Sequence, residues 1–161
     1  MIHNKRAFMR RFGGVYEHSD WVAEKVFDAG PPEPEALPDA MRQIVEDAGR
    51  SAQLALLRAH PDLAGKLATA GALTTESTSE QASAGLDQCT EAEFAEFTAL
   101  NTRYKSSFGF PYILAVRGRN RHEILENFRE RVTHTPETEF REALDQVHQI
   151  ASLRLEDLLE I

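Results

Sequence analysis

The chain has a single cysteine, Cys89, among its 161 residues, and this scarcity excludes two kinds of framework. An intramolecular disulfide and a cysteine-based zinc site both need more than one thiol. None of the six histidines stands in a His-Glu-x-x-His arrangement, and no group of His, Asp and Glu has metal-ligand spacing. We therefore expect no bound metal, and the low cysteine content suits a reducing compartment.

Long apolar runs and an excess of positive charge are also missing. No apolar run approaches the roughly 20 residues needed to cross a bilayer, and the first residues lack the apolar stretch of a signal peptide. We therefore expect a cytoplasmic protein. Eighteen Lys and Arg against 26 Asp and Glu leave a net charge of −8, which argues against a nucleic-acid or anionic-membrane surface. A small anionic substrate is still compatible, because a pocket can be locally positive in an acidic protein.

Hydrophobic periodicity is helical nearly throughout, and no segment alternates with the period of two that is typical of β-strands. Residues 37–58 predict one helix broken near Gly49, or two helices. The length suits one domain with a single core. We predict an all-α fold with one domain over residues 1–161, a single-domain helical bundle of about seven to nine helices with a long C-terminal helix.

Three helix starts carry capping signals. Thr90 with Glu93 and Asn120 with Glu123 both have the spacing of a capping box. Thr135-Pro136 has cap and first-turn chemistry for the last and longest helix. These local signals predict where three of the longer helices begin.

The last predicted helix has one apolar stripe, and Arg154 borders it. The stripe repeats at helical spacing through Phe140, Leu144, Val147, Ala151, Leu155 and Leu158. In one interpretation, Arg154 covers the core with its methylene groups while its head group reaches solvent. In the other, its guanidinium lies at the floor of a pocket and binds a carboxylate or ureido oxygen through its planar fork.

A second group of arginines is interpreted as mostly solvent-exposed. These residues alternate with glutamates at Glu123, Glu126 and Glu130, a pattern typical of a solvated helix face. We predict mostly solvent-exposed side chains for Arg117, Arg119, Arg121, Arg129 and Arg131.

His60 occupies a position where a helix must end, because the following Pro61 disfavours helical backbone at the residue before it. An imidazole has an unperturbed pKa of about 6.5, so His60 is suited to carry a proton at neutral pH. The alternative is a structural histidine that satisfies the last carbonyls of the preceding helix. We keep both interpretations open on the residues alone.

Ser77, Glu80 and Gln81 fall within one helical turn or so of one another. Ser77 with Glu80 matches a capping box, and Ser77 lies four residues before Gln81, so the three side chains share one side of a helix start. Free N–H groups at such a start bind carboxylates or carbonyls. Capping and substrate binding are therefore compatible here.

A Phe108-Gly109-Phe110-Pro111 turn leads into the apolar run Tyr112, Ile113, Leu114, Ala115 and Val116. This run is too short and too close to proline to predict a helix. It is either plain core or an irregular buried segment, and the backbone groups of an irregular segment need partners. A urea-like ligand can supply such partners.

Taken together, these motifs resemble the 2-oxo-4-hydroxy-4-carboxy-5-ureidoimidazoline (OHCU) decarboxylase family over roughly residues 12–158. Beside the segments above, residues 14–24 (GVYEHSDWVAE) look like the family's opening, Leu100-Asn101-x-x-Tyr104 its middle and Ile150-Ala151-x-x-Arg154-Leu155 its close. The chain departs mildly at Asp20, where the family often has proline, and at Tyr112, where phenylalanine is common. Neither departure removes a chemical group that the site needs.

The resemblance implies an all-helical, cofactor-free decarboxylase that forms (S)-allantoin in urate degradation and is usually a homodimer. It implies catalytic roles for His60 and Glu80. It also implies a substrate site lined by Pro61, Ser77, Glu80, Gln81, Tyr112, Ile113, Leu114, Ala115, Val116 and Arg154. Two other classes remain as alternatives: a helical binding or adaptor domain without turnover, and a metal-assisted ureide hydrolase that would use His60, Asp62 and Glu80 as ligands.

Overall fold

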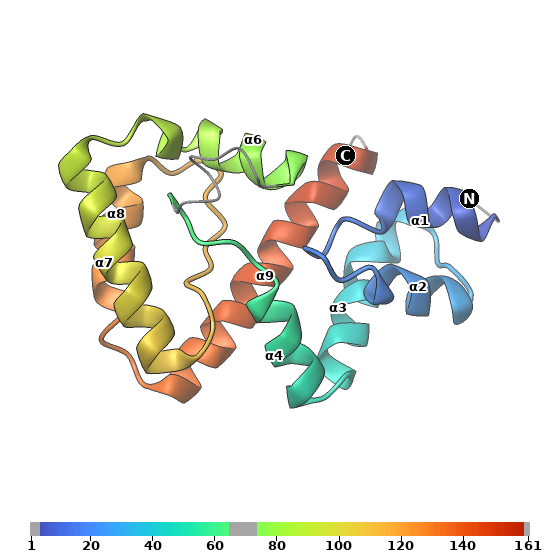
Figure 1. Ribbon diagram of the computed structural model, residues 1–161. Helices are drawn as coiled ribbons and strands as arrows, with labels where there is room; N and C mark the ends of the chain where they lie inside the picture. Colours follow the sequence, from blue (N-terminus) through green and yellow to red (C-terminus); the bar gives the residue numbers. More distant parts are fainter. Residues whose placement is uncertain (1–3, 65–73, 160–161) are drawn as a thin grey trace. The chain divides into compact units, whose positions relative to one another are not determined.

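The computed structural model describes residues 4–64 and 74–159 (Figure 1). Within these ranges the chain forms eight α-helices and two short 3-10 helices, and it contains no β-strand, so the all-α prediction is confirmed. The helices are α1 (Lys5–Phe12), α2 (Trp21–Asp28), η1 (Pro34–Ala36), α3 (Leu37–Asp47), α4 (Arg50–Arg58), α6 (Thr75–Ser83), η2 (Leu86–Gln88), α7 (Glu91–Phe108), α8 (Arg121–Arg131) and α9 (Pro136–Leu159). The C-terminal helix α9 is the longest of these at 24 residues, as predicted.

The chain divides into two compact units. The first comprises Met1–Ala59 together with Leu144–Ile161, and the second comprises His60–Ala143. Helix α9 contributes its first turns to the second unit and the rest to the first. A single domain over residues 1–161 stays a prediction.

In the first unit, α2 packs against α1 and α3. The ring of Phe8 on α1 contacts Phe12 and Phe27 at centroid distances of 4.9 and 5.3 Å. Residues 37–58 form two helices, because Gly49 adopts a φ of +90° between α3 and α4, a conformation that favours glycine.

The apolar stripe predicted on α9 is confirmed for most of its length. Five of its six members are buried, namely Phe140, Leu144, Val147, Ala151 and Leu155. Leu158 is only half-buried.

In the second unit, α7 and α8 lie side by side (Figure 1). Both of their predicted capping boxes are present, at Thr90 with Glu93 and at Asn120 with Glu123. Helix α7 ends at Gly109, whose φ of +79° turns the chain into the segment before α8. The apolar contact between the two helices includes the rings of Phe97 and Phe128, with centroids 6.3 Å apart.

The capping box predicted at Ser77 is wrong. Helix α6 begins three residues earlier than a Ser77 cap requires, because the Thr74 side chain caps it by accepting a hydrogen bond from the Ser77 amide at 3.2 Å. Thr74 and Ser77 have similar local capping chemistry, so the sequence pattern did not separate them.

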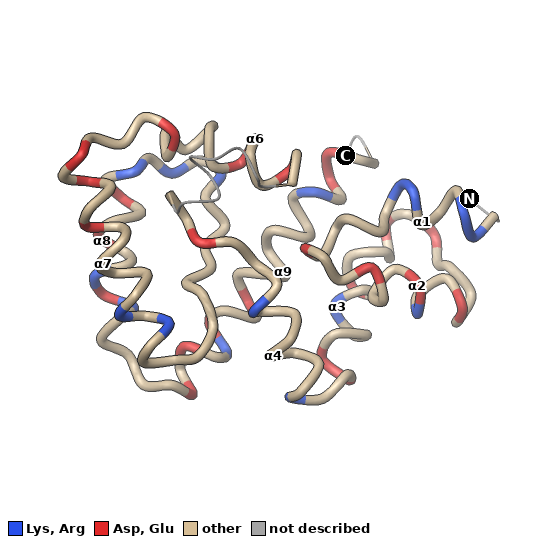
Figure 2. The backbone as a smooth tube through the Cα atoms, in the orientation of Figure 1, with Lys and Arg blue, Asp and Glu red and all other residues tan. Residues whose placement is uncertain are grey.

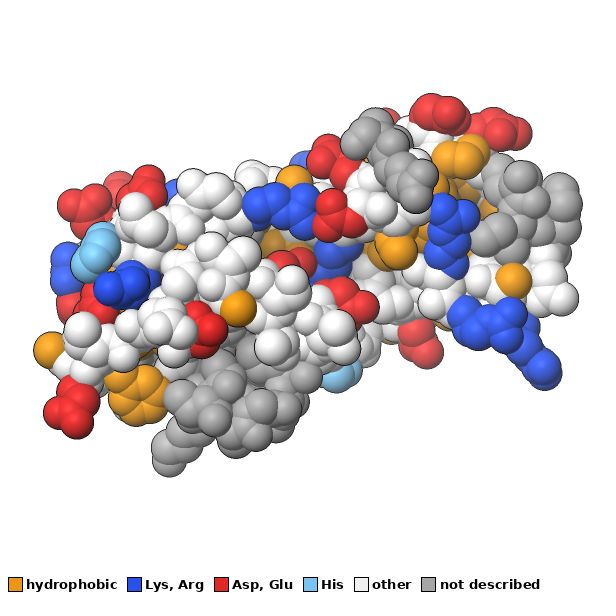
Figure 3. Space-filling model, turned by 90° about the horizontal axis from the view of Figure 1, so that it is seen from above, with side chains coloured by type: hydrophobic (Ala, Val, Ile, Leu, Met, Phe, Trp, Pro, Cys, Tyr) orange, Lys and Arg blue, Asp and Glu red, His pale blue; other side chains and the backbone are white. Residues whose placement is uncertain are grey.

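Charged residues of both signs are interspersed along the backbone (Figure 2). The face shown in Figure 3 likewise mixes acidic and basic side chains with polar ones, without a broad area of one sign. Over the described ranges, none of the helices is both long and apolar enough to cross a membrane.

Candidate active site

His60 lies two residues after the end of α4, at the start of the loop that leads away from that helix. Its side chain is buried, with 8% of the residue exposed, and Pro61 after it prevents the helix from continuing. The predicted turn position of His60 is thus confirmed. Burial on a loop is a setting in which a proton-transfer group is held in place and shielded from bulk water.

Three side chains of the second unit hold this loop. Gln81 on α6 accepts a hydrogen bond from the Ala64 amide at 3.0 Å and donates one to the Asp62 carbonyl at 3.3 Å. Asn101 on α7 donates to the Leu63 carbonyl at 3.0 Å. Lys105, one turn further along α7, pairs with the Asp62 carboxylate at 2.7 Å. The loop that carries His60 is therefore fixed by helices distant from it in sequence.

These contacts show that Gln81 stabilises the His60 loop, a role that the sequence did not reveal. Each end of its side-chain amide makes one hydrogen bond to the loop backbone, and each end retains capacity for a second. Gln81 and Ser77 are both buried and lie one helical turn apart, as predicted, while Glu80 is half-buried beside them. The Ser77 amide, however, already donates to Thr74 and is not a free ligand-binding group.

The segment from Tyr112 to Val116 is irregular and fully buried, which confirms that it is not a helix. Within the part of the chain that the structure describes, the amide N–H groups of Ile113, Leu114 and Val116 donate no hydrogen bond. Buried amides normally have partners, so these groups are suited to bind a carbonyl or carboxylate of a ligand.

One carbonyl of this segment is held by a buried arginine that we predicted to be exposed. Arg131 is only 2% exposed, and its Nη1 donates to the Ile113 carbonyl at 2.6 Å. Its Nε donates to the Glu139 carboxylate at 2.9 Å, and Glu139 is completely buried. The prediction of a solvated Arg131 is therefore wrong. The sequence contained a usable signal, because Arg131 follows Ile124 and Phe128 at spacings of seven and three on the buried face of α8.

The surroundings of Arg131 keep it charged and keep its tyrosine neighbours neutral. Burial disfavours a charged guanidinium, but Tyr104 and Glu139 outweigh this effect and raise the pKa of Arg131. Burial also raises the pKa of Tyr104 and that of Tyr112. The Tyr104 hydroxyl donates a hydrogen bond to Glu139 Oε1 at 2.6 Å.

Arg154 lies in the first unit, where its guanidinium is buried rather than solvent-exposed. Its Nη2 is 2.8 Å from Glu17 Oε2, and its Nη1 donates to the carbonyls of Gly14 and Val15 at 3.3 Å each. Only 6% of its side chain is exposed. The interpretation in which the head group reaches solvent is therefore wrong, and the contacts place Arg154 against the GVYE motif near the start of the chain.

A metal site at the predicted ligands has no support in this geometry. Among residues 4–64 and 74–159, no three His, Cys, Asp or Glu side chains lie close enough together to hold a metal ion. His60, Asp62 and Glu80 thus do not form the ligand set of a metal-assisted hydrolase. Asp62 instead pairs with Lys105.

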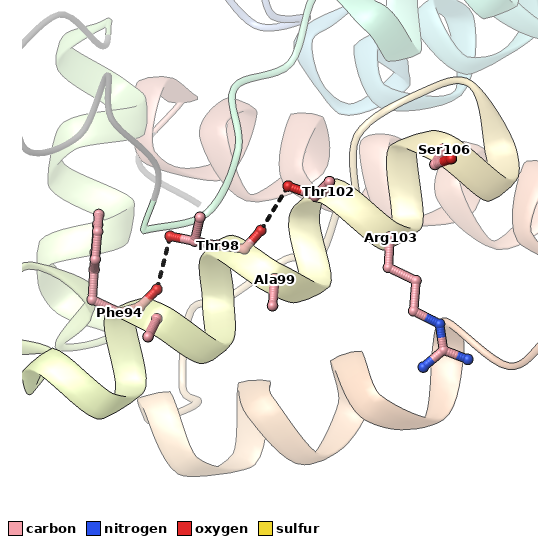
Figure 4. A pocket seen from close by; sticks show the side chains of 7 residues that line it. Phe94, Thr98, Ala99, Thr102, Arg103 and Ser106 are labelled. Carbon is pink, nitrogen blue, oxygen red and sulfur yellow. Dashed lines mark hydrogen bonds between the residues drawn. The ribbon is translucent and has the colours of Figure 1, made fainter.

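Two hollows elsewhere contain none of the predicted site residues. One is an open depression along α7, lined by Phe94, Ala95, Thr98, Ala99, Thr102, Arg103 and Ser106 (Figure 4). The other is a cavity of about 40 Å³ in the first unit, beside Tyr16, Arg42 and His148. A cavity of that size holds at most a few waters, whereas small-molecule sites usually occupy several hundred cubic ångströms.

The chain is similar to known proteins over nearly its whole length. The family model of OHCU decarboxylase matches residues 3–156, which includes segments of both units. An OHCU decarboxylase of Haloferax volcanii is 45% identical over 150 residues, with 92% of this chain and 87% of that protein covered. An OHCU decarboxylase of Halalkalicoccus jeotgali is 42% identical over 156 residues, with 96% of this chain and 86% of that protein covered.

A solved structure agrees with the sequence relatives. The crystal structure of an (S)-allantoin synthase superposes with a TM-score of 0.75 at 36% identity, and the match covers 96% of this chain and 50% of that one. Fold and sequence thus agree over nearly all of the chain. The chain belongs to the OHCU decarboxylase family.

Proposed function

We propose that this chain is a carboxy-lyase that decarboxylates OHCU and yields (S)-allantoin in urate degradation. The observation that carries the proposal is the extent of the family match, because residues 3–156 include every segment assigned to the site. The relatives at 45% and 42% identity are named for this reaction.

The proposed reaction needs no electron-accepting cofactor, because the substrate carries its own electron acceptor. In the substrate, the departing carboxylate and a hydroxyl share one ring carbon, and the ring C=N bond beside it accepts the electron pair released as CO₂ leaves. A proton is then delivered to one face of the neighbouring carbon. The main tasks of the protein are therefore orientation and proton transfer.

We assign these tasks to the residues that the family resemblance implies. His60 moves a proton at the substrate hydroxyl and carboxylate, and Glu80 orients the hydroxyl or ring groups. Gln81 holds the His60 loop and uses its remaining hydrogen-bonding capacity toward the substrate. Pro61 and Ser77 line the site beside them.

The irregular segment and Arg154 complete the assignment. The backbone of Tyr112, Ile113, Leu114, Ala115 and Val116 binds the ureido and ring oxygens, an assignment supported by the buried amides of Ile113, Leu114 and Val116 that donate no hydrogen bond within the described chain. Arg154 binds substrate oxygens through its guanidinium, the role that the family resemblance implies. The proposed enzyme is cytoplasmic and works as a homodimer.

The direct test is the stereochemistry of the product. The protein is added to OHCU freshly generated by enzymatic urate oxidation, and circular dichroism follows the appearance of optically active allantoin. We expect an (S)-allantoin signal that forms faster than the spontaneous reaction. Racemic allantoin at the spontaneous rate would contradict the proposal, and an equal amount of His60→Ala protein is the matched control.

A further inference from the structure

We infer that Arg131 is a positioning residue of the decarboxylase site, which sets the place of the Ile113 carbonyl and thereby of the substrate-binding backbone around it. The inference rests on the proposed role of residues 112–116 in binding substrate. Arg131 reaches the segment from α8, 18 residues further along the chain.

Arg131 contacts the segment in two ways. Its Nη1 donates to the Ile113 carbonyl at 2.6 Å, and its guanidinium carbon lies 4.6 Å from the centroid of the Tyr112 ring. The first contact restrains the backbone, and the second restrains the side chain immediately before it. A cation over an aromatic ring is attracted by the charge distribution of the ring.

The guanidinium is itself held by its other contacts. Its Nε donates to Glu139 Oε1 at 2.9 Å, and Tyr104 donates to the same oxygen at 2.6 Å. The second oxygen of Glu139 lies 2.9 Å from Nδ1 of His134. Glu139 is thus restrained by three side chains, so the direction of the Arg131 fork is determined before any substrate arrives.

Tyr112 makes two further contacts with α8. Its ring stacks on Phe128 at a centroid distance of 3.8 Å with an interplanar angle of 8°, and its hydroxyl donates to Asn127 Oδ1 at 2.5 Å. Because Tyr112 contacts Phe128, Asn127 and Arg131, the start of the segment is restrained against α8. The hydroxyl contact also gives a role to the tyrosine that stands where the family commonly has phenylalanine.

The Arg131–Glu139 pair does more than fill the core. A buried ion pair is often replaced by apolar side chains without loss of stability, because the desolvation of two charges offsets their attraction. An apolar pair could fill the same space, but it could not hold the Ile113 carbonyl. An irregular segment lacks the regular hydrogen bonds of a helix, so loss of the Arg131 contact lets its substrate-binding backbone shift.

The test compares Arg131→Lys with Arg129→Lys. A lysine at 131 keeps the charge, but one ammonium cannot reproduce the planar fork that reaches Glu139 and Ile113 together. Arg129 is the matched control, because it lies on the same helix and pairs with Glu96 at the surface. We expect Arg131→Lys to raise KM for OHCU about 10-fold or more, with a smaller change in kcat and a melting temperature well above that of the assay. Arg129→Lys should change neither kinetic constant.

A second variant distinguishes loss of the Ile113 hydrogen bond from a general folding defect. Arg131→Met combined with Glu139→Gln removes both charges, so that no unpaired charge is left buried, while the Tyr104 hydroxyl keeps an acceptor. The Ile113 carbonyl still loses its donor, so the same rise in KM is expected. Unchanged KM in a folded Arg131→Lys or double variant would overturn the inference.

Amide hydrogen exchange provides a readout that does not depend on turnover. In Arg131→Lys, the peptide containing residues 112–116 should exchange about 10-fold faster, while peptides from the first unit keep their rates. Unchanged exchange in that peptide would also overturn the inference. Absence of turnover by the unmodified enzyme would instead remove the proposed function, and the exchange result would still decide whether Arg131 fixes the segment.

Discussion

Arg154 and Glu17, 137 residues apart in the sequence, form a buried ion pair with Arg154 Nη2 2.8 Å from Glu17 Oε2. The exposed fractions of the two side chains are 6% and 1%. Because Glu17 is so deeply buried, removal of its guanidinium partner leaves a carboxylate in a poorly solvated place. The pair therefore has consequences for stability that are separate from any contact with substrate.

Arg154→Met should lower the free energy of unfolding by about 3–5 kcal/mol, because it removes the guanidinium partner of the buried Glu17 carboxylate. Combining it with Glu17→Gln should restore most of that loss, since the double variant buries no unpaired charge. Urea denaturation of the parent, the single variant and the double variant measures both effects. Equal stability of the single variant and the parent would contradict the importance of the pair.

The same double variant tests the substrate role of Arg154. If the guanidinium also binds OHCU, kcat/KM should fall about 10–150-fold even though the fold is retained, because a charge-assisted hydrogen bond is lost. Parent-like kcat/KM in the stable double variant would assign Arg154 a purely structural role.

His60→Ala should lower turnover by about 10²–10⁴-fold, the contribution expected of a positioned proton carrier. The loop should stay in place, because Gln81, Asn101 and Lys105 hold it through its backbone and Asp62. Circular dichroism of the helices and the melting temperature check the fold. His122→Ala is the control, since 71% of the His122 side chain is exposed, and activity near normal in His60→Ala would exclude His60 from the mechanism.

Gln81→Ala should affect both stability and activity, because it removes the acceptor for the Ala64 amide and the donor to the Asp62 carbonyl. Leaving those backbone groups unsatisfied costs about 1–3 kcal/mol of unfolding free energy. We expect kcat to fall as well, since the His60 loop loses a restraint. Gln43→Ala is the control, because the Gln43 bond to Asp47 is exposed and its loss should change stability by less than about 0.5 kcal/mol.

Cys89 should react slowly with iodoacetamide at neutral pH. Burial raises the pKa of the Cys89 thiol, and the nearby Glu93 carboxylate adds to the rise. Because only the thiolate reacts, the rate should increase at a higher pH in the folded protein than in the same protein unfolded in guanidinium chloride. Coinciding pH profiles for the two states would contradict the predicted shift.

The proposed homodimer predicts a particle of twice the 18.1 kDa mass of the chain. Light scattering coupled to size-exclusion chromatography at micromolar protein measures this mass directly. A mass of one chain across that range would contradict the proposal.

Local signals in the sequence determined the helices well. The capping boxes at Thr90 and Asn120, the break at Gly49 and the turn at Gly109 all involve residues within a few positions of one another. Such interactions depend on the chain nearby and little on what packs against it. The capping failure at Ser77 has the same origin, because Thr74 offered an equivalent local cap one turn earlier.

The site was only partly predictable for a different reason. The sequence predicted site roles for His60, Gln81 and the irregular segment at residues 112–116 from residue type and spacing. It did not reveal that Gln81 holds the loop of His60, nor that Arg131 is buried. Those properties depend on partners 17 and 18 residues away in the chain, at Ala64 and Ile113, and on how completely neighbouring helices exclude water.

The environment of the charged side chains is where the sequence predicted least of what the tertiary structure shows. The sequence by itself determined the all-α fold, because helix periodicity and caps are local, and its motifs determined the family that the chain resembles. Only the tertiary structure decided which arginines are structural partners, since a guanidinium is equally compatible with solvent and with a buried carboxylate until that carboxylate is brought to it. Arg131 with Glu139 and Arg154 with Glu17 are both such cases: Coulomb attraction and hydrogen bonding in a water-poor interior stabilise pairs whose members the linear pattern does not connect.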